Sequence, residues 1–150
     1  MTGMPFIKMH GLGNDFVVLD GREASLPIGV AEARAIGDRR TGVGFDQLLI
    51  MRPARDSAAD VFMEIRNTDG SEAEACGNGT RCVAALVMDE TGNDSISVET
   101  VAGVLPATRR EDGLVCVDMG PANLDWSDIP LAKAADTLHI ELEGAPLSDA

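Results

Sequence analysis

The chain has 150 residues, of which 45% are hydrophobic and 25% are charged, so it is long and apolar enough for one globular domain with a sizeable core. Its formal net charge of −13 excludes nucleic acid as a partner, because nucleic-acid binding draws much of its free energy from Lys and Arg neutralising phosphates. The same charge disfavours anionic lipid surfaces, and no apolar run approaches the length of about 18 residues that spans a bilayer.

Two short strands joined by a sharp turn are predicted at the start of the chain. Residues 6–9 and 16–19 are apolar runs, and the glycine-rich segment 11–14 between them favours a chain reversal that carries Asn14. Residues 28–39 follow with apolar and charged positions alternating at helical spacing. This pattern predicts a short amphipathic helix.

Two further strands, each bounded by a turn, are predicted in the middle of the chain. Residues 42–47 form a second glycine-rich turn, followed by apolar strands at 48–51 and 60–66. The segment 67–71, Asn-Thr-Asp-Gly-Ser, has the composition of a turn. Three separate turns therefore carry an amide side chain, namely Asn14, Gln47 and Asn67.

A helix and a run of antiparallel strands are expected next. Residues 81–90 are apolar on nearly every face of a helix, which predicts a helix that is buried all round. Strands are predicted at 95–101, 103–108 and 114–119, the last two joined by a turn at Glu111-Asp112-Gly113. From Gly120 onward the composition changes to Pro, Ala and Asp, which indicates a boundary there.

Cys76 lies at the predicted start of the apolar helix. Ser71 and Glu74 have the spacing of a capping box, and Gly77 and Gly79 stand directly ahead of the helix. Unpaired amides and the positive end of the helix dipole favour a thiolate and can bind a carboxylate. We therefore interpret Cys76 as an acid–base thiol that moves a proton at the α-carbon of a small amino acid.

The other candidate groups are interpreted as structural. Cys82 and Cys116 fall within an apolar helix and strand, where a cysteine is usually a small buried hydrophobe. A zinc site is not expected, because His10 and His139 are far from each other and from Cys76 in sequence. An odd number of cysteines and the lack of a secretory signal in the first residues predict a soluble, cytoplasmic protein with free thiols.

Three blocks in register resemble the N-terminal half of the diaminopimelate epimerase family over residues 5–120. The blocks are His10-Gly11-Leu12-Gly13-Asn14-Asp15-Phe16, Gly44-Phe45-Asp46-Gln47, and Asn67-x-Asp69-Gly70-Ser71-Glu72-x-x-x-Cys76-Gly77-Asn78-Gly79-x-Arg81-Cys82. The resemblance implies interconversion of LL- and meso-diaminopimelate, on the path to lysine and peptidoglycan, without pyridoxal phosphate or metal. It also implies that two cysteines transfer the protons, the first of them being Cys76.

The resemblance further implies an architecture and a set of substrate contacts. Family members have two similar α+β domains, each a mixed, mostly antiparallel sheet wrapped around a central apolar helix, with the active site between them. Residues 1–119 would form the first domain, and 120–150 the crossover and the start of the second. The implied substrate-binding residues are Asn14, Gln47 and Asn67, with backbone amides from Gly77 and Asn78. A homodimer is implied for the complete protein.

The sequence lacks a second Cys-Gly loop like that at Cys76. Inversion at Cα without a cofactor needs one group on each face of the carbon, so we expect the 150 residues alone to be inactive. Two alternatives stay open. One is a related isomerase of the same fold, such as a proline racemase, and the other is a non-catalytic domain in which Cys76 senses oxidation or binds a carboxylate ligand.

Overall fold

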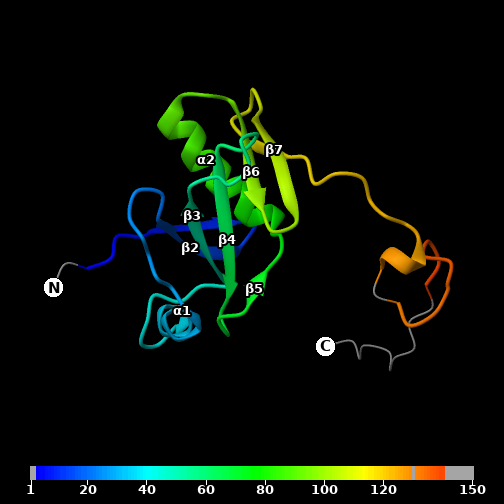
Figure 1. Ribbon diagram of the computed structural model, residues 1–150, viewed down its shortest axis with the longest axis horizontal. Coiled ribbons are helices and arrows are strands. Elements are labelled where there is room, and N and C mark those ends of the chain that lie inside the picture. Colours follow the sequence, from blue (N-terminus) through cyan, green and yellow to red (C-terminus); the bar gives the residue numbers. More distant parts are fainter. Residues whose placement is uncertain (1–2, 130, 141–150) are drawn as a thin grey trace. The chain divides into compact units, whose positions relative to one another are not determined.

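The computed structural model describes residues 3–129 and 131–140 of the chain (Figure 1). The chain divides into two compact units between Met119 and Gly120, and each is described by itself. Among the described residues, the strands and both α-helices belong to the first unit. The elements of the first unit are β1 Ile7–Gly11, β2 Asn14–Asp20, α1 Val30–Gly37, β3 Gln47–Arg52, β4 Val61–Asn67, β5 Glu72–Ala73, α2 Gly77–Thr91, β6 Ser95–Thr100, β7 Gly103–Arg109 and β8 Val115–Val117.

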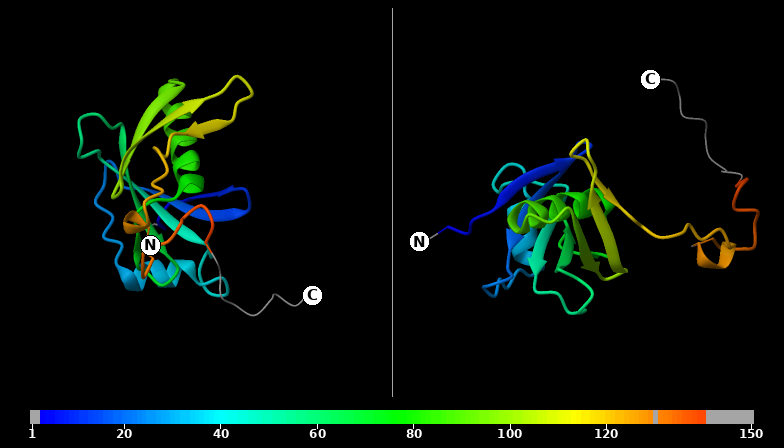
Figure 2. Two further views of the ribbon diagram at one scale, coloured as in Figure 1. Left: turned by 90° about the vertical axis from the view of Figure 1, so that its right-hand side faces the viewer. Right: turned by 90° about the horizontal axis from the view of Figure 1, so that it is seen from above.

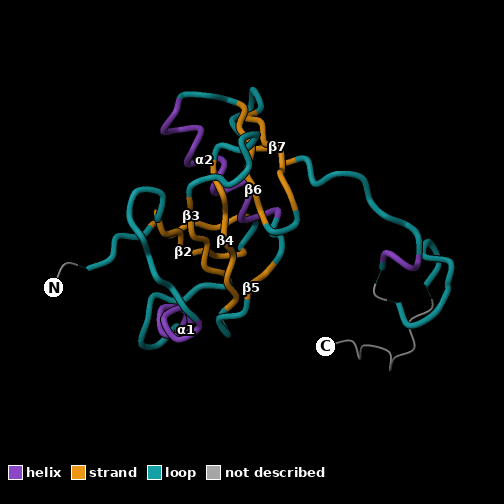
Figure 3. Tube along the Cα trace, in the orientation of Figure 1, coloured by secondary structure: helices purple, strands orange, loops and turns teal. Residues whose placement is uncertain are grey.

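The strands of the first unit form one mixed sheet in the order β1-β2-β3-β4-β6-β7-β8, with β5 paired to β4 (Figure 3). Two of the pairings, β2 with β3 and β4 with β6, are parallel. The others are antiparallel. The predicted α+β class with a mixed, mostly antiparallel sheet is confirmed.

The first hairpin has the sharp reversal that its glycines predict. Gly11 pairs with Asn14, and the two residues between them, Leu12 and Gly13, both have positive φ angles, 54° and 87°. Successive positive φ angles twist a two-residue turn in the sense that matches the strands on either side. Asn14 is thereby fixed as the first residue of β2, at the end of the hairpin.

Strand β3 is buried on both faces and separates two apolar clusters. Leu49 and Met51 belong to the larger cluster, which contains most of the buried face of α2. Leu48 and Ile50 belong to the smaller cluster, which contains Ala33 of α1. Because successive side chains of a strand point to opposite faces, the two helices pack on opposite sides of the sheet.

Helix α2 lies along one face of the sheet and contacts strands near both ends of the strand order, including β1 and β8 (Figure 2). Its buried face includes Val83, Val87 and Met88, but Ala85 and Leu86 are only partly buried. The prediction that this helix is buried all round is therefore wrong. A single layer of strands that curves past a helix covers only part of the helix's circumference, even where the opposite side is also apolar.

The cysteine predictions have different outcomes. Cys82 is 6% exposed, as predicted, and burial raises the pKa of its thiol. Cys116 is exposed, which contradicts its interpretation as a buried hydrophobe. It lies on β8, the last strand of the sheet, where Val115 and Val117 point toward the core cluster and the residue between them points away.

The second unit has little regular structure in its described part. It contains the 3-10 helix Trp126–Asp128, whose first amides are capped by the Asp125 carboxylate, 2.9 Å from the Ser127 nitrogen. The predicted segment 120–150 includes residues 130 and 141–150, which lie outside the described residues. Within the described part of the chain, no helix is long and apolar enough to cross a membrane.

Candidate active site

Cys76 is the N-cap residue of α2, as its sequence context predicts. Its backbone is extended, and its sulfur accepts a hydrogen bond from the Gly79 amide at 3.3 Å. The Cys76 carbonyl accepts hydrogen bonds from both the amide and the hydroxyl of Thr80, at 2.8 and 2.9 Å. The thiol thus takes the place of the Ser, Thr or Asp that usually caps a helix. Cys76 is partly exposed.

The predicted capping box at Ser71 and Glu74 does not exist, because α2 starts only at Gly77. Ser71 instead closes the turn after β4. Its amide and hydroxyl both donate to the Asp69 carboxylate, at 2.9 and 2.6 Å. These bonds lower the pKa of Asp69 below its usual value.

The glycines at the start of α2 have different structural roles. A Cβ at Gly79 would lie 3.1 and 3.2 Å from the two methyl carbons of Leu49, so this glycine allows the helix to approach the sheet closely. A Cβ at Gly77 would meet Met119 at an ordinary 3.6 Å. The amides of Gly77 and Asn78 are the first two of the helix, and no intrahelical carbonyl precedes them to accept their hydrogens. Such amides can bind a carboxylate.

Asn14 lies beside the thiol, although it is 62 residues away in sequence. Its Oδ1 is 3.8 Å from the Cys76 sulfur and 3.5 Å from the Asn78 side-chain nitrogen. Gly11, across the hairpin turn, makes this approach possible, because a Cβ there would be 3.3 Å from Asn78. The structure therefore brings together three of the predicted site residues, Cys76, Asn14 and Asn78.

Gln47 and Asn67 form a second pair at the same end of the sheet as Asn14. The register aligns Gln47 with Phe16 of β2 on one side and with Asn67 of β4 on the other. The Gln47 amide nitrogen donates to Asn67 Oδ1 at 3.1 Å, and Asn67 Nδ2 donates to the Ser71 hydroxyl at 3.1 Å. The side-chain hydrogen bonds of this pair thus run within the pair and to the turn, whereas those of the Cys76 sulfur run to Asn14 and Gly79.

A charged cluster supports the hairpin end of the site. Arg39 and Lys8 both pair with the Asp15 carboxylate, and Arg39 also contacts Asp46 at 2.9 Å. The Arg39 guanidinium, followed by Lys8, holds the pKa of Asp15 well below its usual range. Asp46 in turn accepts from Asn14 Nδ2 at 3.2 Å.

Arg81 donates a hydrogen bond to Asn78 Oδ1. Sequence reasoning missed the supporting roles of Asp15, Arg39, Asp46 and Arg81. Asp15 and Asp46 are sequence neighbours of Asn14 and Gln47, and Arg81 follows Asn78 by three residues. Their place in the motif blocks could have indicated these roles. The position of Arg39 gave no such indication, because Arg39 and its partner Asp15 are 24 residues apart in sequence.

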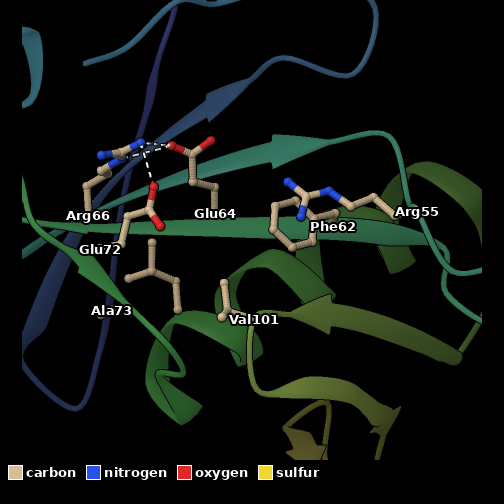
Figure 4. Close-up of a pocket in the computed structure, with 8 residues that line it drawn as sticks. Arg55, Phe62, Glu64, Arg66, Glu72, Ala73 and Val101 are labelled. Carbon is tan, nitrogen blue, oxygen red and sulfur yellow. Dashed lines mark hydrogen bonds and ion pairs between the residues drawn. The ribbon is translucent and has the colours of Figure 1, made fainter. Parts of the chain in front are cut away.

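A small hollow elsewhere on the sheet is not part of this site (Figure 4). It has a volume of about 140 Å³, and none of the predicted site residues line it. Arg66 is paired there with Glu64 and Glu72, so its charge is compensated, and the Arg55 guanidinium stacks 3.8 Å from the Phe62 ring (Figure 4). Among the described residues, no group of three or more His, Cys, Asp or Glu side chains is arranged to hold a metal ion.

Comparison with known structures identifies relatives of the fold. The chain is similar to a probable proline racemase from Agrobacterium radiobacter, with a TM-score of 0.61 and 21% identity, over 82% of this chain and 44% of that one. A hydroxyproline epimerase from Agrobacterium vitis matches with a TM-score of 0.60 and 21% identity, over 81% of this chain and 44% of that one. At this level of identity the likeness concerns the fold alone.

Sequence comparison is more specific. The chain is 59% identical over 145 residues to the diaminopimelate epimerase of Rhodospirillum centenum, covering 97% of this chain and 50% of the relative. The corresponding enzyme of Acidiphilium cryptum is 52% identical, covering 97% and 52%. The chain thus spans about half the length of these curated relatives. The sequence model of the family described as diaminopimelate epimerase matches residues 6–124, and the chain belongs to this family.

Proposed function

We propose that this chain supplies one acid–base thiol, Cys76, to a cofactor-independent epimerase that interconverts LL- and meso-diaminopimelate. The observation that carries the proposal is the position of the Cys76 sulfur. The sulfur lies at the start of α2 between the Gly79 amide and Asn14 Oδ1, in a residue that is partly exposed. Family membership supplies the substrate, since close relatives are named for diaminopimelate.

The proposed chemistry uses the backbone amides at the N-terminus of α2. The α-carboxylate of the substrate binds the Gly77 and Asn78 amides, which places Cα beside Cys76. The thiolate then removes the α-proton and becomes a thiol, while the electron pair left on Cα spreads onto the carboxylate. The helix amides stabilise this charge as it develops. A second group returns a proton to the opposite face of Cα, which inverts its configuration.

Asn14, Gln47 and Asn67 are proposed to contact the substrate. They lie at one end of the three neighbouring strands β2, β3 and β4, and Asn14 already touches Cys76. We also propose that α2 is the central helix of a domain formed by residues 1–119. Its contacts with β1 and β8 support this arrangement.

The second acid–base group is proposed to be a cysteine in the part of the protein that aligns with the remaining half of the relatives. Of the cysteines in these 150 residues, only Cys76 is followed by glycine and caps a helix. The 150-residue chain alone should therefore catalyse no epimerisation of diaminopimelate in D₂O. Epimerisation at an ordinary enzymatic rate would contradict the assignment. A cytoplasmic location and a homodimer of the complete protein remain part of the proposal.

A proline racemase activity is the alternative of the same fold. It is supported only by structural likeness at 21% identity, whereas sequence identity of 52–59% favours diaminopimelate. The two substrates also differ in size and charge, since diaminopimelate carries a second amino-acid group at its far end. This group needs additional polar contacts, and we propose that Gln47 and Asn67 supply them by exchanging their present hydrogen bonds for bonds to the substrate.

Substrate protection of the thiol tests the proposal. The full-length protein is treated with iodoacetamide, and alkylation of Cys76 is followed by peptide mass spectrometry with and without diaminopimelate. We expect diaminopimelate to slow alkylation of Cys76 but not of the exposed Cys116, with proline as the control ligand. Protection by proline instead would favour the racemase, and protection by neither ligand would argue against a substrate site at Cys76.

A further inference from the structure

A row of four side chains runs past the Cys76 sulfur, and each donates a hydrogen bond to the next. Arg81 donates to Asn78 Oδ1, Asn78 Nδ2 donates to Asn14 Oδ1 at 3.5 Å, and Asn14 Nδ2 donates to the Asp46 carboxylate at 3.2 Å. The row crosses from α2 to the β1–β2 hairpin and on to the residue before β3. It therefore connects three elements that meet at the site.

The charges at the two ends fix the direction of the row. The Arg81 guanidinium can only donate hydrogen bonds, and the Asp46 carboxylate, when ionised, can only accept them. If the Asn78 amide rotated by half a turn, its NH₂ group would face the Arg81 guanidinium. If the Asn14 amide did so, its carbonyl oxygen would face the Asp46 carboxylate. Both asparagines are thereby held in one orientation, in which Asn14 Oδ1 faces the Cys76 sulfur at 3.8 Å.

Both carboxylate oxygens of Asp46 accept hydrogen bonds, although its side chain is 47% exposed. Its Oδ1 accepts from Arg39 at 2.9 Å, and its Oδ2 accepts from the Asp15 backbone amide at 3.0 Å as well as from Asn14. A carboxylate with both oxygens engaged has little freedom to rotate. It can therefore impose its orientation on the Asn14 amide rather than follow it.

We propose that Asp46 and Arg81 are positioning residues that act through Asn14 and Asn78 to keep a carbonyl oxygen against the Cys76 sulfur. The Gly79 amide donates to the same sulfur at 3.3 Å. The sulfur therefore has an acceptor for its thiol form and a donor for its thiolate form, as suits a group that both takes up and releases a proton. The role in turnover rests on the proposed function, whereas the effect on thiol reactivity does not.

A double-mutant cycle in the full-length protein tests this role. Asp46→Asn replaces one carboxylate oxygen with an NH₂ group. With the remaining oxygen kept toward Arg39, which can only donate, this NH₂ group faces Asn14, so the Asn14 amide can turn its own NH₂ group toward the sulfur. We expect alkylation of Cys76 at pH 7 to become about threefold faster and kcat for epimerisation to fall about tenfold, with a smaller change in KM. Both changes should disappear when Asp46→Asn is made in an Asn14→Ala background.

The second background separates positioning from a general charge effect. If Asp46 acted only through its charge, Asp46→Asn would still change Cys76 alkylation and kcat in the Asn14→Ala background, and that result would overturn the proposal. An unchanged rate of Cys76 alkylation in Asp46→Asn alone would overturn it as well. If Asp46→Asn fails to fold, Arg81→Met removes the donor at the other end of the row. Its effect on Cys76 alkylation should likewise disappear in the Asn14→Ala background. Coupled alkylation rates in a wild-type protein that does not epimerise diaminopimelate would refute the proposed function and leave the positioning role standing.

Discussion

Replacing Gly79 with alanine should lower the free energy of unfolding by about 1 kcal/mol, although alanine is the better helix former. The new methyl group would lie 3.1 and 3.2 Å from the Leu49 methyl carbons. Leu49 is fully buried in the larger apolar cluster, and the close packing of a protein interior resists the shift that the new methyl group requires. Overpacking of this kind costs roughly 1–3 kcal/mol, and the gain in helix propensity offsets about 1 kcal/mol of it.

Gly77→Ala is the matched control in the same helical turn. Its methyl group would meet only Met119, at 3.6 Å, so we expect stability equal to or slightly above that of the wild type. Urea unfolding of the full-length protein, followed by circular dichroism, measures both midpoints under the same conditions. The reasoning would be refuted if Gly79→Ala were as stable as Gly77→Ala.

Three further predictions concern stability and thiol reactivity. Because Arg39 lowers the pKa of Asp15, the ionised carboxylate stabilises the fold at neutral pH, and this stabilisation is lost as the pH falls below about 4. Asp15→Asn should therefore be less stable than the wild type by about 1 kcal/mol or less at neutral pH. This difference should shrink when unfolding is measured at progressively lower pH. In the 150-residue chain, Cys116 should react with iodoacetamide much faster than Cys82, since it is exposed while burial raises the pKa of Cys82, and equal rates would contradict the described packing. Gly42→Ala should destabilise by roughly 3 kcal/mol in thermal unfolding, because its methyl group would lie 2.2 Å from a backbone oxygen.

Local features of the site could be predicted from the sequence because they depend on nearby residues. The glycine-rich turn predicted the reversal before Asn14, and the glycines after Cys76 predicted a helix start there. Short-range rules of this kind operate over a few residues. They therefore place each side chain on its own element but say little about which elements meet.

The remaining features depend on the order of strands in the sheet. The parallel pairing of β2 with β3 brings Asp46 to Asn14, and no local pattern signals a contact over 32 residues. The exposure of Cys116 likewise follows from the place of β8 at the end of the sheet. An apolar run in sequence cannot distinguish an edge strand from a central one.

The central claim is that Cys76 moves the proton at the α-carbon, and one comparison tests it most directly. Full-length Cys76→Ala and the matched control Cys116→Ser are incubated with diaminopimelate in D₂O, and the α-proton signal is followed by NMR. We expect Cys76→Ala to lose epimerisation by about a hundredfold or more, the usual contribution of an acid–base group, while Cys116→Ser keeps the wild-type rate. Epimerisation by Cys76→Ala at the wild-type rate would contradict the claim.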